Sequence, residues 1–139
     1  MDDTTFTPGE FTTSLPDASS TLTSIRARLG DAPSQAALGL LCTRERRYEE
    51  ALEWLDKAAS TLPVASVMYY NATILSGAQG LGYQQRAVAH LRAAANANCW
   101  EALQVLASLH VHGEGVPKDL SEASRLIERS RAIRGKNDA

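Results

Sequence analysis

The sequence has few aromatic residues, few cysteines and little net charge. Aromatic residues make up 6% of its 139 positions, only two cysteines are present, and the formal net charge is −2 at neutral pH. Two cysteines cannot build a disulfide-rich scaffold, and they favour a reducing compartment. A charge this close to zero leaves no overall electrostatic footprint for nucleic acid. With few aromatic residues and no disulfide framework, the fold is expected to depend on a hydrophobic core of aliphatic and small residues.

Long apolar runs are also missing. No stretch of 18 apolar residues occurs, so we expect no membrane-spanning helix and no membrane insertion. The first ten residues contain neither a basic region nor an apolar segment, so no secretory signal is expected and a cytoplasmic location is predicted. Residues 1–16, rich in Thr, Ser and Pro, are predicted to form a flexible arm.

Apolar residues at helical spacing are abundant instead, and the clearest example lies between residues 100 and 134. Two helical patterns, 100–112 and 120–134, flank a turn that contains Gly113 and Gly115, residues able to adopt positive φ. Asp119 precedes the second pattern and is predicted to cap that helix. The segment therefore predicts a pair of antiparallel helices.

The same small–large–small pattern recurs upstream at intervals of 36 residues. The recurring positions are Ala51, Ala87 and Ala123; Leu55, Leu91 and Ile127; and Ala58, Ala94 and Ser130. Recurring small residues let neighbouring helices approach closely, so the spacing favours stacked helix pairs. The alternative is an alanine-rich helical bundle in which the register arises by chance.

The outer two units resemble known repeat families. The third resembles a Sel-one-like repeat through Ala102, Leu106, Gly113, Gly115, Val116, Asp119 and Ala123. It departs from that pattern at Ala107, where Gly is usual, and at His110, where Tyr is usual. The first resembles a tetratricopeptide repeat through Leu38, Gly39, Tyr48, Ala51, Leu55, Ala58 and Pro63, with Cys42 replacing a usual Tyr. The middle unit keeps only the recurring core positions, and the resemblance covers about 32–134.

This resemblance implies an all-α fold, a short right-handed α-solenoid of about three helix-turn-helix repeats with an N-terminal capping helix. One domain is expected over 17–134, with repeats at about 32–63, 65–97 and 99–134 and a frayed tail at 135–139. The capping helix, 17–30, carries a stripe of Leu22, Ile25 and Leu29 that we expect to cover the first repeat. In the second helix of that repeat, Glu53 and Lys57 are predicted to form an ion pair one turn apart, worth about 0.3 kcal/mol.

Catalytic and cofactor chemistry finds little support in the sequence. His110 and His112 are two residues apart on a helix and therefore point roughly 200° apart, which does not suit a shared metal. The run from Gly77 to Gly82 superficially resembles a phosphate loop, but no Lys–Ser/Thr follows it. We therefore predict no enzyme activity, no cofactor and no metal site.

The function implied by the resemblance is the binding of another protein in a concave groove lined by the first helix of each repeat. The candidate contacts on these helices are Tyr69, Tyr70, Asn71, Trp100 and Gln104. The alternative is that most of these side chains are core between helices. An adaptor or chaperone, including a secretion chaperone, is the favoured role. An inhibitor or immunity-type protein that occludes a partner enzyme, or a self-assembling structural subunit, remain open.

Overall fold

The computed structural model describes residues 18–77 and 81–138, and the secondary structure of these residues is helical. Seven helices occur within these ranges: α2 (Ala18–Arg28), α3 (Ala32–Arg44), α4 (Tyr48–Ala59), α5 (Ala65–Ser76), α6 (Leu81–Asn96), α7 (Trp100–His112) and α8 (Leu120–Asp138). The predicted all-α class is confirmed. The N-terminal arm, the first residue of the expected capping helix and the middle of the glycine turn at 78–80 lie outside the described residues.

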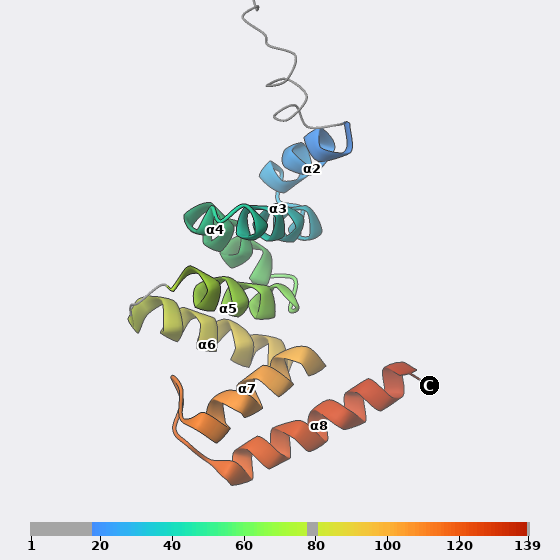
Figure 1. Ribbon diagram of the computed structural model, residues 1–139. Helices are drawn as coiled ribbons and strands as arrows, with labels where there is room; N and C mark the ends of the chain where they lie inside the picture. Colours follow the sequence, from blue (N-terminus) through green and yellow to red (C-terminus); the bar gives the residue numbers. More distant parts are fainter. Residues whose placement is uncertain (1–17, 78–80, 139) are drawn as a thin grey trace, which may run out of the picture.

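The helices are layered in the order of the chain, from α2 at one end to α8 at the other (Figure 1). Each helix contacts the next one along the chain, and α3 also contacts α5, as α5 contacts α7. The largest core cluster joins α6, α7 and α8, around Leu91, Leu103 and Leu106. A second cluster joins α4, α5 and α6, around Leu55 and Tyr69.

The nine recurring positions of the sequence lie at these helix contacts. Ala51, Ala58, Ala87, Ala94, Ala123 and Ser130 are each at most 3% exposed, as are Leu55 and Leu91. Only Ile127 is partly exposed. Gly39 of α3 lies directly against α4, where a Cβ atom would come within 2.5 Å of the Leu55 side chain. Small residues therefore allow the close approach that their spacing predicts.

The turn between α7 and α8 forms as predicted. Gly113 and Gly115 adopt φ values of 70° and 73°, in the left-handed region that glycine tolerates best. The Asp119 carboxylate accepts a hydrogen bond of 3.0 Å from the backbone N–H of Glu122 and caps α8. His110 is 2.9 Å from the Pro117 carbonyl through Nδ1, which donates because a carbonyl oxygen can only accept. This bond fastens the turn to α7.

Two expectations about the chain ends are wrong. The helix α8 continues to Asp138, past Arg134, because Gly135 does not take the positive φ that ends a helix. The predicted stripe of Leu22, Ile25 and Leu29 does not cover the helices that follow it, since these residues are 50%, 48% and 81% exposed. The close contact with α3 is made instead by Ala27, whose carbonyl accepts a hydrogen bond from Gln35.

Ala87→Leu is expected to lower the free energy of unfolding by about 1–3 kcal/mol. Ala87 is 2% exposed and packs in the cluster of Leu52, Leu55 and Tyr69, which leaves no room for a larger side chain. Urea denaturation measures the effect. Ala89→Leu is the matched control, because Ala89 is exposed on the same helix, and it should change stability little. Equal stability of the two variants would contradict the packing described for α6.

Candidate binding groove

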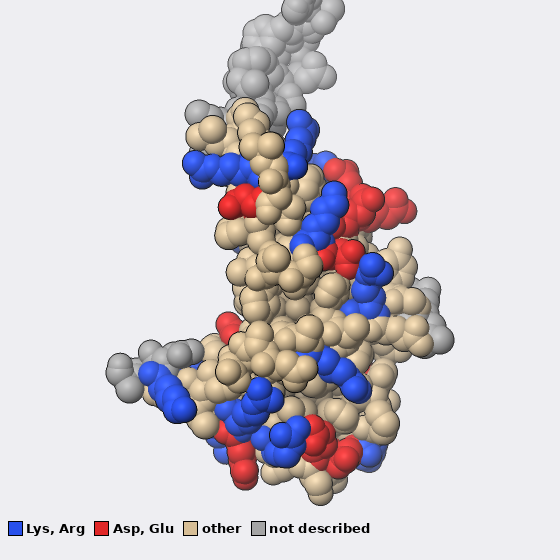
Figure 2. Space-filling model, turned by 180° about the vertical axis from the view of Figure 1, so that it is seen from behind, with Lys and Arg blue, Asp and Glu red and all other residues tan. Residues whose placement is uncertain are grey.

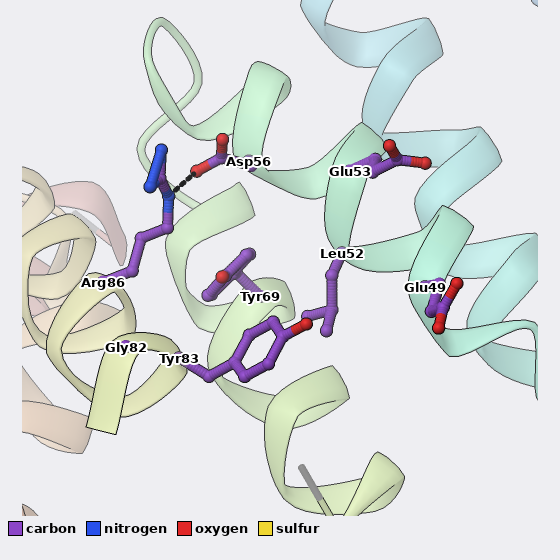
Figure 3. A pocket seen from close by; sticks show the side chains of 8 residues that line it. All are labelled: Glu49, Leu52, Glu53, Asp56, Tyr69, Gly82, Tyr83 and Arg86. Atoms are coloured by element: carbon purple, nitrogen blue, oxygen red, sulfur yellow. Dashed lines mark hydrogen bonds and ion pairs between the residues drawn. The ribbon is translucent and has the colours of Figure 1, made fainter. Parts of the chain in front are cut away.

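An open groove of about 580 Å³ lies where α4, α5 and α6 meet (Figure 3). Eight residues line it: Glu49, Leu52, Glu53 and Asp56 from α4, Tyr69 from α5, and Gly82, Tyr83 and Arg86 from α6. The α4 residues are spaced by three and four positions, which places them on one helix face. One wall is therefore a single helical stripe, and the opposite wall is the first turns of α6.

Asp56 connects the two walls. A single oxygen, Oδ1, accepts a hydrogen bond of 2.8 Å from Nε of Arg86 and lies 2.7 Å from Nε2 of His90. Both basic residues belong to α6, so this carboxylate holds α6 against α4. Figure 3 shows the contact with Arg86. The ring of His90 in turn meets the Tyr69 ring edge-on, with centroids 5.2 Å apart. This end of the groove is thus fixed by charge and ring contacts.

Tyr69 contributes an almost fully buried aromatic ring and its hydroxyl group to the groove. The residue is only 2% exposed, yet its hydroxyl makes no hydrogen bond to any residue that the structure describes. Burial, together with the negative charge of Asp56, raises the pKa of Tyr69. The hydroxyl therefore stays protonated at neutral pH and is able both to donate and to accept a hydrogen bond.

The other wall presents free carboxylates. Glu49 and Glu53 are exposed and make no ion pair or hydrogen bond within the described part of the chain. The predicted pair between Glu53 and Lys57 does not form, because Lys57 lies over the Trp54 ring, 5.0 Å from its centroid. The cation–π contact thus leaves Glu53 without the partner that the sequence suggested.

Two neighbouring acidic residues, Glu45 and Glu50, form ion pairs. Arg47 binds Glu45 at 2.8 Å and Glu50 at 2.7 Å, and it lowers the pKa of Glu50. Figure 2 shows acidic side chains gathered on one flank, at the level of α3 and α4. Among the acidic residues of α4, Glu49 and Glu53 line the groove and have no ion-pair partner among the described residues.

Of the five residues predicted as contacts, Tyr69 alone lines the groove. Tyr69 is buried rather than exposed, so that expectation is wrong for it, although it lines the groove from α5. Tyr70 is half-buried and packs against both main core clusters. The ring of Trp100 lies beneath the Arg134 guanidinium at 4.8 Å. Asn71 and Gln104 are exposed.

Sequence reasoning missed the residues that form most of the groove. The spacing of Glu49, Leu52, Glu53 and Asp56 carries a signal, because it marks one helix face with three carboxylates around a leucine. Tyr83 and Arg86 carry no comparable signal. Their position opposite α4 depends on how α6 crosses α5, which local patterns do not encode.

Other reactive groups offer no site in the described ranges. His110 and His112 each place Nδ1 near a backbone carbonyl, that of Pro117 and that of Ser108. Burial raises the pKa of both thiols, Cys42 and Cys99, which makes them poor nucleophiles. No group of three or more potential metal-ligating side chains occurs among residues 18–77 and 81–138.

The groove combines apolar surface with a hydroxyl group and carboxylates. No described helix is long and apolar enough to cross a membrane. Comparison of the chain with protein-family models, with curated proteins and with solved structures yields no match.

Proposed function

We propose that this chain is a short right-handed α-solenoid, related to Sel-one-like and tetratricopeptide repeats, that serves as a protein-interaction module. The layered order of the helices and the contacts of α3 with α5 and of α5 with α7 support the arrangement. The burial of small residues at 36-residue intervals supports the repeat. In this proposal each pair, α3–α4, α5–α6 and α7–α8, is one repeat.

The module binds a segment of another protein in the groove between α4, α5 and α6. The observation that carries this proposal is the groove itself, about 580 Å³ in volume and lined by polar and apolar groups together. Tyr83 is 42% exposed at its edge. Tyrosines of this kind supply apolar area with a polar tip, a combination enriched in protein interfaces. The role of adaptor or chaperone follows from such binding without catalysis.

Tyr83→Ala is expected to weaken binding of a groove ligand about tenfold, because it removes the exposed ring at the edge of the groove. The ligands are short peptides selected by phage display against the immobilised full-length protein. Fluorescence polarisation with labelled peptides then measures their affinity. Because Tyr83 is partly exposed, the variant should keep its thermal midpoint.

Asn71→Ala/Gln104→Ala is the matched control. These exposed residues lie on α5 and α7, on the first helices that the sequence pattern favoured, and the structure places neither in the groove. The double variant should bind the selected peptides as tightly as the unmodified protein. Loss of binding in this variant, with normal binding by Tyr83→Ala, would instead locate the site on the first helices.

A further inference from the structure

We infer that the groove recognises a polypeptide segment with a basic side chain, arginine or lysine, next to a large apolar residue. This inference rests on the proposed function and specifies the chemistry of the occupant. Three carboxylates, those of Glu49, Glu53 and Asp56, line the groove against one guanidinium, that of Arg86. The net charge of the groove lining is therefore negative, which favours a cationic occupant.

The unbalanced charge is concentrated on two of these carboxylates. Asp56 is already bound by Arg86 and His90, whereas Glu49 and Glu53 have no partner among the residues that the structure describes. They lie four residues apart on one face of α4, where like charges repel. A cation bound between or beside them removes this repulsion and forms charge-assisted hydrogen bonds.

The hydroxyl of Tyr69 is a second indication of a ligand. The residue as a whole is only 2% exposed, and its hydroxyl, which is not fully shielded from the groove, makes no hydrogen bond to a described residue. Tyr69 lines the same groove, between Arg86 and Leu52 (Figure 3). An occupant that brings a donor or acceptor to this hydroxyl satisfies it.

The apolar lining sets the second requirement. Leu52 is 7% exposed and forms part of the wall, and the Tyr83 ring lies across from it (Figure 3). The aliphatic stem of an arginine or lysine packs on such a surface while its charged head reaches the carboxylates. An adjacent apolar residue of the segment covers what remains of the Leu52–Tyr83 surface.

The test compares the peptides that phage display selects on two full-length variants. Selection on the unmodified protein should enrich Arg or Lys next to a large apolar residue, and Glu49→Gln/Glu53→Gln should lose this enrichment. Replacing the basic residue of a selected peptide by alanine should weaken its binding about tenfold, and added salt should weaken the original peptide. The control Glu114→Gln/Glu128→Gln removes the same charge from exposed positions outside the groove and should keep the enrichment.

Tyr69→Phe tests the hydroxyl separately. It should weaken binding severalfold without lowering the thermal midpoint, because the hydroxyl has no partner within the described fold to lose. A lowered midpoint with unchanged binding would overturn the role given to Tyr69.

The remaining outcomes separate this inference from the proposal on which it rests. Peptides that lose binding in Tyr83→Ala but show no basic preference would overturn the charge requirement and leave the groove as a protein-binding site. Selected peptides indifferent to Tyr83→Ala and to Glu49→Gln/Glu53→Gln would overturn both.

Discussion

We expect Leu55→Ala to lower the free energy of unfolding by about 2–5 kcal/mol. Leu55 is 1% exposed and lies at the junction of α3, α4 and α5, where its side chain covers the backbone of Gly39 and packs in the cluster of Leu52 and Tyr69. Truncation removes these contacts and leaves a cavity. The helices are already packed closely, so they cannot move together to fill it. Urea denaturation at constant pH measures the loss.

Gly39→Ala tests the same contact from the other side. A Cβ atom at residue 39 would lie 2.5 Å from Cγ and Cδ2 of Leu55, so the variant should lose about 1–3 kcal/mol even though alanine favours helices. In the double variant the new methyl group enters the space that Leu55→Ala opens. The double variant should therefore lose less free energy of unfolding than the two single variants together, by about 1 kcal/mol or more.

Gly82→Ala is the control for the glycine substitution. Gly82 also lies in a helix, but a Cβ atom there meets nothing within 4 Å. Alanine at residue 82 should leave stability unchanged or raise it by up to about 1 kcal/mol. Strict additivity of Gly39→Ala and Leu55→Ala would show that α3 and α4 do not meet at this contact.

A loss of about 2–5 kcal/mol is likewise expected for Leu103→Ala. Leu103 is fully buried in the cluster that joins α6, α7 and α8, so its truncation leaves a cavity shared by three helices. The change in midpoint and slope of urea denaturation, followed by circular dichroism, measures it.

Leu120→Ala is the matched control, because it is the same substitution at an exposed position. Leu120 is 62% exposed at the start of α8, so the same truncation removes little packing and should shift stability by no more than about 0.5 kcal/mol. Equal losses in the two variants would mean that α7 does not occupy the centre of this cluster.

The helices could be predicted from the sequence because their signals are local. Gly113, Gly115 and Asp119 set the turn and cap before α8 through backbone preferences of a few neighbouring residues. The small residues at 36-residue intervals identified the helix contacts for the same reason, since close approach depends on side-chain size.

The groove could not be predicted, because some of its side chains have two possible contacts and the sequence does not show which one forms. Lys57 has both Glu53 and the Trp54 ring within reach, and local spacing favours the ion pair that does not form. The exposed stripe of α2 shows the same limit. Its periodicity suggests a buried face, whereas the contact with α3 uses the smaller Ala27. Which of two possible contacts forms depends on the tertiary packing, which local sequence patterns do not specify.

The layering of the helices also bears on how the chain acquires its structure. Because each described helix packs against the next or next but one along the sequence, most native contacts close short loops. Proteins in which local contacts dominate fold faster than proteins of the same size with mainly non-local contacts. Asp56 makes one of the longer-range contacts of this kind, since it reaches residues 30 and 34 positions away in α6. This carboxylate therefore ties α4 directly to α6, two helices further along the chain.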